Sequence, residues 1–290
     1  MKTGTLSSMR TRRRINTVVR YTILIAVGLF LAYPLFWMIG SAFKQNADIF
    51  GNLNILPPPG RGTTEFFPAA WQLTSRNNMA FYYMNTLRFL IPRVIGTIIS
   101  CTITAFAIAR YKFKGKKVVF TVVIITLLMP EIAFRIPIFL LYRDLNLIDT
   151  FASLYIQEFF AVGSFFVFMI IQFMRTIPRE LDESAAIDGC GPLRTLWHIL
   201  VPILRPIIIT VGLLTFMWGM NDFQGPLIFI NSPERQVLAQ ALRGLLQDYE
   251  VTHFGQIFAA AFMAMIPTLA IFFACSKFFV EGVANSGGKE

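Results

Sequence analysis

Six long apolar runs divide the chain, and polar or charged residues separate them. A helix needs about 20 residues to cross the apolar core of a bilayer, and each run has about that length. We therefore predict an all-α integral membrane protein with six transmembrane helices: Tyr21–Phe43, Thr86–Ala109, Val118–Leu141, Phe151–Met174, Ile207–Ile230 and Phe258–Phe279. Membrane helices tolerate proline and often kink there, so we expect bends near Pro92, Pro130, Pro137, Pro226 and Pro267.

The composition agrees with lipid as the main surrounding. Of 290 residues, 55% are hydrophobic and only 14% are charged, with 30 Phe among them and a mean hydropathy of +0.60. The three cysteines are far apart and none has CxxC spacing, so we expect neither a disulfide framework nor a metal site. His198 and His253 lack a carboxylate at ligand spacing, which favours helix-surface positions over catalysis.

The basic residues predict the orientation, because Lys and Arg gather on the cytoplasmic side of a membrane. With the N-terminus inside, 17 of the 26 basic residues fall in cytoplasmic segments: residues 1–20, 110–117, 175–206 and the C-terminal segment. Those segments carry a net charge of +11 and the rest of the chain carries −1. The overall charge of +10 is therefore explained by topology, and a nucleic-acid partner is not needed.

The predicted order of segments follows from these runs. The "RTRRR" before the first run resembles the start of a signal peptide, but the run is too long for a typical h-region and lacks a convincing cleavage site, so we expect an uncleaved signal-anchor. The segments are a basic cytoplasmic N-terminus (1–20), a first transmembrane helix (21–43), an extracytoplasmic loop (44–83), a core of five helices (84–280) and a cytoplasmic tail (281–290).

Two loops carry further patterns. The Pro-rich, partly aromatic loop 44–83 is either a docking surface or cap, or a flexible connector. The loop 231–257 has Val237, Ala241, Leu242 and Leu245 near helical spacing, which predicts a short interfacial helix.

The cytoplasmic segment 175–206, between the fourth and fifth runs, contains the polar stretch "ELDESAAIDGCGPLRTLWHILVP". We predict a first short helix, with Thr176 as its cap and Pro178 in its first turn. Acidic residues Glu180, Asp182 and Glu183 favour the positive end of its dipole.

Gly189 can supply the left-handed residue that ends this helix. A second helix is predicted from Pro192, with an apolar face made by Leu193, Leu196, Trp197 and Leu200. Pro202 and Pro206 would separate it from the fifth run. We call Glu180–Pro202, which lies within the cytoplasmic segment 175–206, the bracket.

The bracket allows two interpretations. In the first, Ser184, Ala185 and Ala186 permit close approach by a partner, while Glu183 and Asp188 offer charge to its Arg or Lys. In the second, the bracket is an amphipathic hairpin that rests on the membrane.

The spacing of the bracket resembles the EAA loop of ABC-importer membrane subunits. That pattern is present as Glu183-Ser184-Ala185, Gly189, Ile199 and Pro202, with Ser184 and Val201 as mild departures. The chain is similar to the MalG-type permease subunits of carbohydrate importers in three further stretches, whereas its first forty residues and residues 51–80 match loosely. These stretches are Met129–Thr150, Trp218–Ile230, and "FGQIFAAAF" with the tail "KFFVEGVANSGGKE".

The resemblance implies a type I ABC importer permease fold in a bacterial inner membrane, with both termini cytoplasmic. It implies a transport subunit and not an enzyme, with a second permease subunit, two ATPase subunits, an extracytoplasmic binding protein and a carbohydrate substrate. The sequence has no GxxxxGK[ST] loop, so ATP and magnesium would be bound by the ATPase partner. Coupling to the ATPase would use Glu183, Ser184, Ala185, Ala186, Asp188, Gly189, Ile199 and Pro202, and the tail Val283–Glu290 would also reach the ATPase.

The substrate pathway is marked only by polar residues in apolar surroundings. Asn221 and Asp222 lie inside the fifth run, and an acid in a membrane is a candidate for function. Alternatively, Asp222 pairs with one of Arg88, Arg93 and Arg135 for structural reasons. Three such arginines near the outer pathway would suit an anionic sugar.

Three other functions compete with a carbohydrate importer. An ABC permease for another solute class has the same architecture, but the MalG-like stretches argue against it. A secondary transporter or membrane scaffold would leave the bracket unexplained, and no clear internal repeat supports it. A membrane enzyme is disfavoured because no His-rich or nucleophile constellation is present.

Overall fold

The computed structural model describes residues 4–51, 54–247 and 254–287. In those ranges every regular element is a helix, which confirms the all-α prediction, and the one β-bridge is isolated (Lys44 with Gly62). The helices are α1 Gly4–Ser41, α2 Asn46–Gly51, α3 Phe66–Trp71, α4 Met79–Arg110, α5 Lys116–Leu128, η1 Glu131–Phe134, α6 Arg135–Asp144, η2 Phe151–Leu154, η3 Ile156–Phe160, α7 Ser164–Thr176, α8 Glu180–Ile187, α9 Pro192–Thr195, η4 Leu196–Leu200, α10 Val201–Ile203, α11 Arg205–Met220, α12 Gln224–Phe229, η5 Pro233–Arg235, α13 Leu238–Gln247 and α14 Phe254–Gly287.

Four helical stretches in the described ranges are long and apolar enough to cross a membrane: Arg14–Ser41, Met79–Arg110, Ile156–Thr176 and Phe254–Phe278. Two more spans are obtained when each of two bent helix pairs counts as one. Those pairs are Lys116–Leu128 with Glu131–Asp144, bent by 104°, and Pro192–Ile203 with Arg205–Met220, bent by 81°. Counted in this way the spans number six, as predicted, although the second pair includes Pro192–Ile203, which lies almost entirely in the bracket that the sequence analysis places in the cytoplasm.

Three of the predicted spans are not single helices. The third ends at Leu128, because Met129 before Pro130 is extended, as the residue before a proline prefers. The fourth begins as 3₁₀ turns, and Ala161 with φ 54° separates them from α7. The fifth breaks at Asn221, between α11 and α12.

Of the prolines near which bends were expected, Pro130 follows the end of α5, whereas Pro92 and Pro267 lie inside helices that continue past them, α4 and α14. The short helix predicted in 231–257 is present as α13. The predicted tail contact at 283–290 lies partly outside the described residues.

The chain divides into two compact units. The first comprises Met1–Trp71 with Asp248–Met263. Within it, aromatic rings join the end of α1 to the start of α14: Trp37 lies edge-on to Phe258, with ring centroids 5.4 Å apart, and Phe50 lies edge-on to Phe254 at 4.7 Å. Most large apolar side chains of α1 before this point are exposed within the chain, as lipid or another subunit would require.

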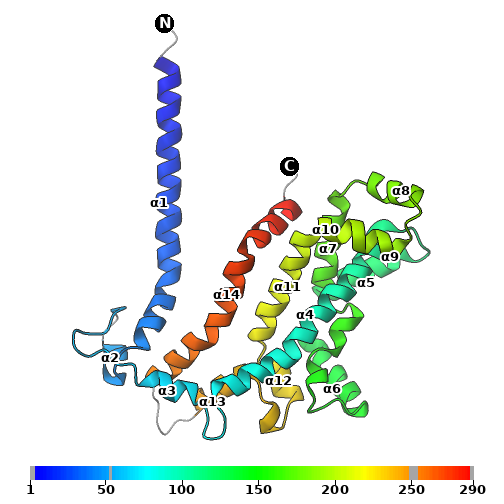
Figure 1. Ribbon diagram of the computed structural model, residues 1–290. Helices are drawn as coiled ribbons and strands as arrows, with labels where there is room; N and C mark the ends of the chain where they lie inside the picture. The colour runs from blue at the N-terminus through cyan, green and yellow to red at the C-terminus, as the bar shows by residue number, and fades with distance from the viewer. Residues whose placement is uncertain (1–3, 52–53, 248–253, 288–290) are drawn as a thin grey trace. The chain divides into compact units, whose positions relative to one another are not determined.

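The second unit comprises Gln72–Gln247 with Ala264–Glu290. Its core lies between α4, α7 and α11, which pack side by side (Figure 1). Fully buried core residues include Cys101, Val167, Ile170, Ile171, Ile207 and Val211. Figure 1 shows α8 and α9 at one end of this unit and α6 and α12 at the opposite end. The two sites described below lie toward these two ends.

Candidate functional site

The first arm of the bracket is α8. Its first turn carries Glu180, Asp182 and Glu183, as the dipole argument predicted. The predicted cap is wrong: Thr176 is the last residue of α7, and its hydroxyl donates to the Phe173 carbonyl at 2.8 Å. Arg179 occupies the N-cap position without a side-chain capping bond, so α8 depends on packing and on its acidic first turn.

Gly189 closes α8 as predicted. Its φ is +76°, the left-handed conformation that glycine adopts without steric cost. The Gly189 amide donates to the Ala186 carbonyl at 3.1 Å and the Cys190 amide to the Ala185 carbonyl at 2.8 Å, which is the Schellman pattern. A Cβ added at Gly189 would meet nothing within 4 Å, so this corner faces open space.

The second arm begins at Pro192 as predicted, continues through a π-helical turn, η4, and ends with α10. The apolar face is only half as predicted. Leu196 and Leu200 are fully buried against the core, whereas Leu193 is 63% and Trp197 is 42% exposed. The π turn has i→i+5 bonding, which displaces residues from the faces of a regular α-helix. The outward apolar residues are thus available to another surface.

Two arginines that the sequence analysis did not assign to the site hold the bracket in place. The Arg110 side chain is 5% exposed; its Nη1 lies 3.3 Å from Oδ2 of Asp182 and donates to the Ile177 carbonyl at 3.1 Å. Arg179 donates to the Ala109 carbonyl at 3.2 Å and so caps the end of α4. Charge-assisted bonds of this kind are the stronger ones in proteins. Their signal in the sequence was the pair of basic residues next to the ends of two apolar runs.

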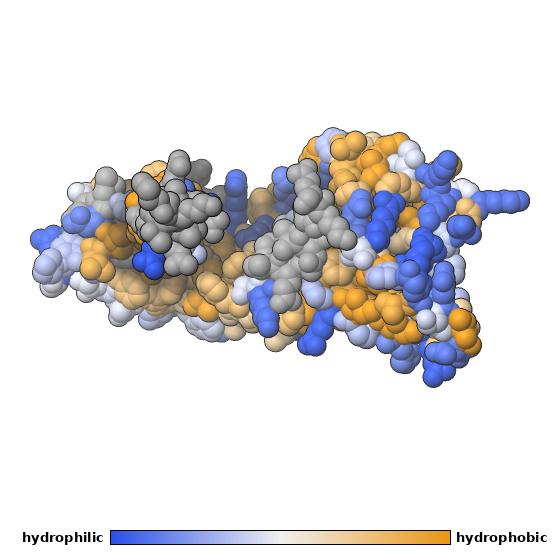
Figure 2. Space-filling model, turned by 90° about the horizontal axis from the view of Figure 1, so that it is seen from above, coloured by the Kyte–Doolittle hydropathy of each residue, from blue (hydrophilic) through white to orange (hydrophobic). Residues whose placement is uncertain are grey.

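The proposed coupling residues divide between an inner and an outer face. Ala185 is buried and Ile199 is partly buried. The exposed members are Glu183, Ser184, Ala186, Asp188, Gly189 and Pro202. Within the described ranges, neither Glu183 nor Asp188 forms an ion pair. Figure 2 views the molecule from the end that carries α8 and α9 and shows hydrophilic and hydrophobic residues mixed there. This face combines unpaired carboxylates with exposed apolar side chains.

A cleft of about 350 Å³ lies between α8 and the end of α4. Its lining includes both signs of charge, Arg110 and Arg179 against Asp182 and Glu183. The bracket is therefore held to the end of α4 by the contacts of Arg110 and Arg179, and a cleft remains between the two elements.

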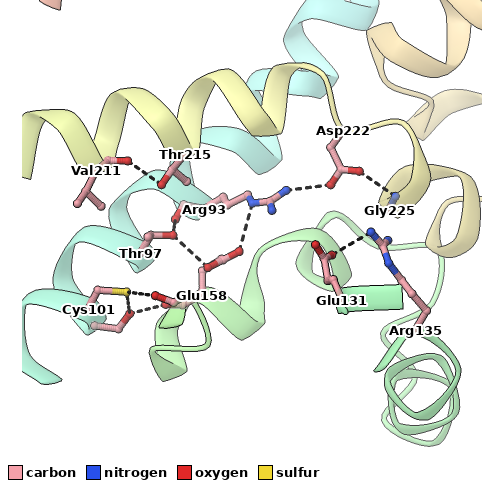
Figure 3. A network of polar contacts seen from close by, with 12 residues as sticks. Arg93, Thr97, Cys101, Glu131, Arg135, Glu158, Val211, Thr215, Asp222 and Gly225 are labelled. Carbon is pink, nitrogen blue, oxygen red and sulfur yellow. Dashed lines mark hydrogen bonds and ion pairs between the residues drawn. The ribbon is translucent and has the colours of Figure 1, made fainter. Parts of the chain in front are cut away.

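The second site is a network of charges at Arg93 (Figure 3). Its guanidinium lies between two carboxylates: Nη1 is 3.0 Å from Oδ2 of Asp222 and Nε is 3.3 Å from Oε1 of Glu158. The three side chains are only 10–21% exposed. Thr97 donates to the other Glu158 oxygen at 3.1 Å, and the Gly225 amide donates to Asp222 at 2.9 Å. The network ties α4, η3 and the α11–α12 break together.

The other predicted pathway residues do not join this network. The side-chain Nδ2 of Asn221 donates to the Met217 carbonyl at 2.8 Å. Arg135 pairs with Glu131 at 2.9 Å, one helical turn away, and Arg88 donates to the Asn85 side chain at 3.1 Å. Of the predicted residues, the structure therefore brings together Arg93 and Asp222. Sequence reasoning missed Glu158, although an acid in an apolar run was the same signal that identified Asp222.

A third polar cluster joins two loops of the second unit. Asp149, which has φ 60°, accepts from the amides of Asn231 and Ser232, both at 2.9 Å, and from the Ser232 hydroxyl; Arg235 lies 2.7 Å away. Burial raises the pKa of Asp149, but the bonds from Ser232 and Asn231 and the charge of Arg235 outweigh it, so that the pKa falls to about 2.

No group of three or more His, Cys, Asp and Glu side chains within the described ranges could hold a metal ion. The polar arrangements reported above are the Arg93 network, the Asp149 cluster and the exposed bracket.

Comparisons with known proteins identify the family to which the chain is similar. The family model described as "Binding-protein-dependent transport system inner membrane component" matches residues 96–284. The galactooligosaccharides transport system permease protein GanQ of Bacillus subtilis (strain 168) is 26% identical over 98% of this chain and 99% of its own length. The melibiose/raffinose/stachyose import permease protein MelC of the same strain is 30% identical over 77% and 80%.

One solved structure shares the fold. It is a chain of a bacterial ABC transporter involved in the import of the acidic polysaccharide alginate, with a TM-score of 0.74 and 20% identity over 92% of this chain and 97% of that one. The likeness supports the predicted importer permease fold.

Proposed function

Because the chain belongs to the family of binding-protein-dependent transport system inner membrane components, we propose that it is the permease subunit of an ATP-driven carbohydrate importer. The membership confirms the family resemblance found in the sequence, and the chain is a multi-pass membrane protein and a transport component. We place it in the cytoplasmic membrane of a bacterium, with both termini in the cytoplasm because of the basic segments counted above.

A carbohydrate substrate is supported by the relatives. The two reported above are named for galactooligosaccharides and for melibiose, raffinose and stachyose. The three arginines give less support to an acidic sugar than their number suggests. Arg93 and Arg135 face carboxylates, and Arg88 is the one of the three that forms no ion pair among the described residues. We therefore propose an oligosaccharide as the substrate. If that oligosaccharide is acidic, Arg88 is the basic side chain that would bind its acidic group.

The bracket is the observation that carries the proposal. Its inner side is fixed by Ala185, Leu196 and the Arg110–Asp182 ion pair, while its outer side presents unpaired acids and exposed apolar residues. A surface of that kind is suited to a groove with basic and apolar walls. We assign this groove to one of two ATPase subunits, which would hold the ATP and magnesium.

The remaining partners follow from the family and from the exposed surface. A second permease subunit would complete the pathway, and an extracytoplasmic binding protein would deliver the sugar. Closure of the ATPase pair would then move the bracket as a lever, and the spans would tilt between inward-facing and outward-facing states.

The decisive experiment changes the corner of the bracket. In Gly189→Glu, a bulky acid projects into the open space in front of the corner. We expect the variant to insert and to assemble with its partners in the membrane, but to hydrolyse ATP without importing sugar. The readout is the ratio of sugar imported to ATP hydrolysed in proteoliposomes that contain the complete importer.

Two controls separate backbone strain from blocked docking. A side chain at φ +76° costs about 1–2 kcal/mol whatever its size, so Gly189→Ala carries the strain alone. Gly189→Gln adds the bulk without the charge. The lever hypothesis is abandoned if Gly189→Glu transports like Gly189→Ala.

A further inference from the structure

A second cavity, of about 630 Å³, lies beside the turn that joins α4 to α5. Four cations line it: Lys112, Lys116 and Lys117 from the turn and the start of α5, and Arg175 from the last turn of α7. Its other walls are mostly apolar or aromatic, including Phe113, Val118 and Phe120. The bracket does not use this cavity, whose lining residues differ from those of the cleft at Asp182.

The positive charge in this cavity is not balanced by an acidic side chain in the part of the chain that the structure describes. No carboxylate lines it, and among the described residues none of its four cations forms an ion pair. Two of the cations are nevertheless held in place. The Lys116 ammonium donates to the Tyr111 carbonyl at 2.9 Å, and the Arg175 guanidinium lies 5.3 Å from the Phe120 ring centroid. Four positive charges in one cavity repel one another, and a bound anion would relieve that repulsion.

An apolar strip leads away from the cavity along α5. Val118, Val122 and Ile125 lie one helical turn apart and are 66%, 54% and 53% exposed. No residue of α5 is buried within the chain. From Val118 to Ile125 the strip rises about 10 Å along the axis of α5, which is less than half of a hydrocarbon core of about 30 Å. A chain lying along this strip would therefore remain inside one leaflet.

We propose that the cavity binds the head group of an anionic phospholipid whose acyl chain lies along the Val118–Val122–Ile125 strip. The cations at the start of α5 would bind the phosphate of the lipid, and the aromatic wall of the cavity would contact the part of the acyl chain nearest the head group. A free phosphate would use the cations but not the strip. The positive-inside rule explains why basic residues lie near the membrane. It does not explain why four of them line one cavity that continues into the Val118–Val122–Ile125 strip.

The test uses the full-length chain, purified with its co-purifying partner subunits and analysed by native mass spectrometry after exchange into phosphatidylglycerol or phosphatidylcholine. The test variants are Lys112→Gln and Lys117→Gln. Lys114→Gln is the matched control, because it removes one charge from the same turn at a residue that does not line the cavity. A basic residue near an anionic lipid surface contributes about fivefold in affinity. We expect each test variant to retain phosphatidylglycerol about fivefold more weakly, and the control to retain it like the wild type.

Several outcomes would overturn the proposal. Equal retention of phosphatidylglycerol in the wild type and both test variants would remove the site. So would equal retention of phosphatidylcholine and phosphatidylglycerol by the wild type. Displacement of the lipid by millimolar inorganic phosphate would show that the apolar strip contributes nothing. Loss of a partner subunit from both test variants, with lipid retention unchanged, would assign the cavity to a protein contact. Because the readout is lipid retention and not transport, it does not depend on the substrate proposed above.

Discussion

The Arg93 network gives the sharpest quantitative prediction. Replacing Arg93 with Met keeps the length and packing of the side chain but removes the positive charge between two carboxylates. Glu158 and Asp222 would then remain in a site where their side chains are only 10% and 21% exposed. Removing one partner of a buried ion pair costs about 3–5 kcal/mol, because the other charge is left unpaired.

The expected loss lies near the lower end of that range. The site is not fully closed to solvent, and Thr97 and the Gly225 amide continue to stabilise the two carboxylates. We therefore expect Arg93→Met to cost about 3 kcal/mol. At about 2–4 °C for each kcal/mol, the thermal midpoint should fall by about 6–12 °C.

Two further variants make the prediction specific to charge. Arg88→Met removes an exposed arginine from the same helix, one that donates to the Asn85 side chain and forms no ion pair among the described residues. This change should alter stability by about 0.5 kcal/mol or less. The triple variant Arg93→Met/Glu158→Gln/Asp222→Asn removes all three charges at nearly constant volume. Because it leaves no unpaired buried charge, it should recover most of the lost stability.

The assay is the folded fraction that survives heating in detergent, measured by size-exclusion chromatography. The reasoning is refuted if Arg93→Met and Arg88→Met have the same thermal midpoint. It is also refuted if the triple variant is no more stable than Arg93→Met alone. Transport by a stable triple variant would also decide between the two roles considered for Asp222. Retained transport assigns it to structure, and lost transport assigns it to the pathway.

Two smaller predictions concern other contacts of the second unit. The pKa of Asp149 is lowered from 3.8 to about 2, so its stabilising effect is complete above about pH 4 and disappears as the pH falls through 2. Asp149→Asn, which tolerates the same backbone conformation, should lose about 1 kcal/mol at pH 7, after allowance for screening by solvent, and clearly less at pH 2, where the carboxyl is half protonated. A thermal-midpoint difference that is as large at pH 2 as at pH 7 contradicts this. A Cβ at Gly219 would overlap the buried side chain of Leu90, so Gly219→Ala should cost about 1–3 kcal/mol. Gly28→Ala, where a Cβ meets nothing within 4 Å, is the control, and equal thermal midpoints of the two variants would exclude the close packing.

The features that the sequence predicted are those set by local physics. Apolar runs identify helices because lipid leaves the backbone no other hydrogen-bond partners. Gly189 and Pro192 mark the corner of the bracket because each has a restricted conformational role, and both occupy the predicted positions. The acidic first turn of α8 was predicted for the same kind of reason.

The features that the sequence did not predict depend on packing between distant segments. Nothing local distinguishes Arg93 from Arg88 as the partner of Asp222, since both are on α4 and the choice depends on which face meets α11. The π turn at Leu196–Leu200 likewise reorganises an apolar face that regular helical spacing describes incorrectly. Pro130 and the pair Asn221 and Asp222 mark the two breaks in the sequence, but apolar residues continue on both sides of each break, so the sequence alone predicted one span in each case.

Two continuous helices join the bracket to the Arg93 network. On α4, Arg110 holds Asp182 of the bracket, and Arg93 lies 17 residues earlier, about 25 Å along the axis. On the other side, α11 begins at Arg205, shortly after the bracket, and ends at Met220, two residues before Asp222.

These two helices also pack against each other through small residues. Gly212 faces Ile98, and Gly219 faces Leu90, so their backbones approach closely along the shared length. A displacement of the bracket by an ATPase partner would therefore reach Asp222 through whole helices, because close-packed segments shift as rigid bodies more readily than they deform. The 81° bend before α11 and the break after Met220 are the places where such a motion can change direction. The ion pairs of Arg93 with Asp222 and Glu158 lie at the second of these places, where they would resist or release the movement of α12.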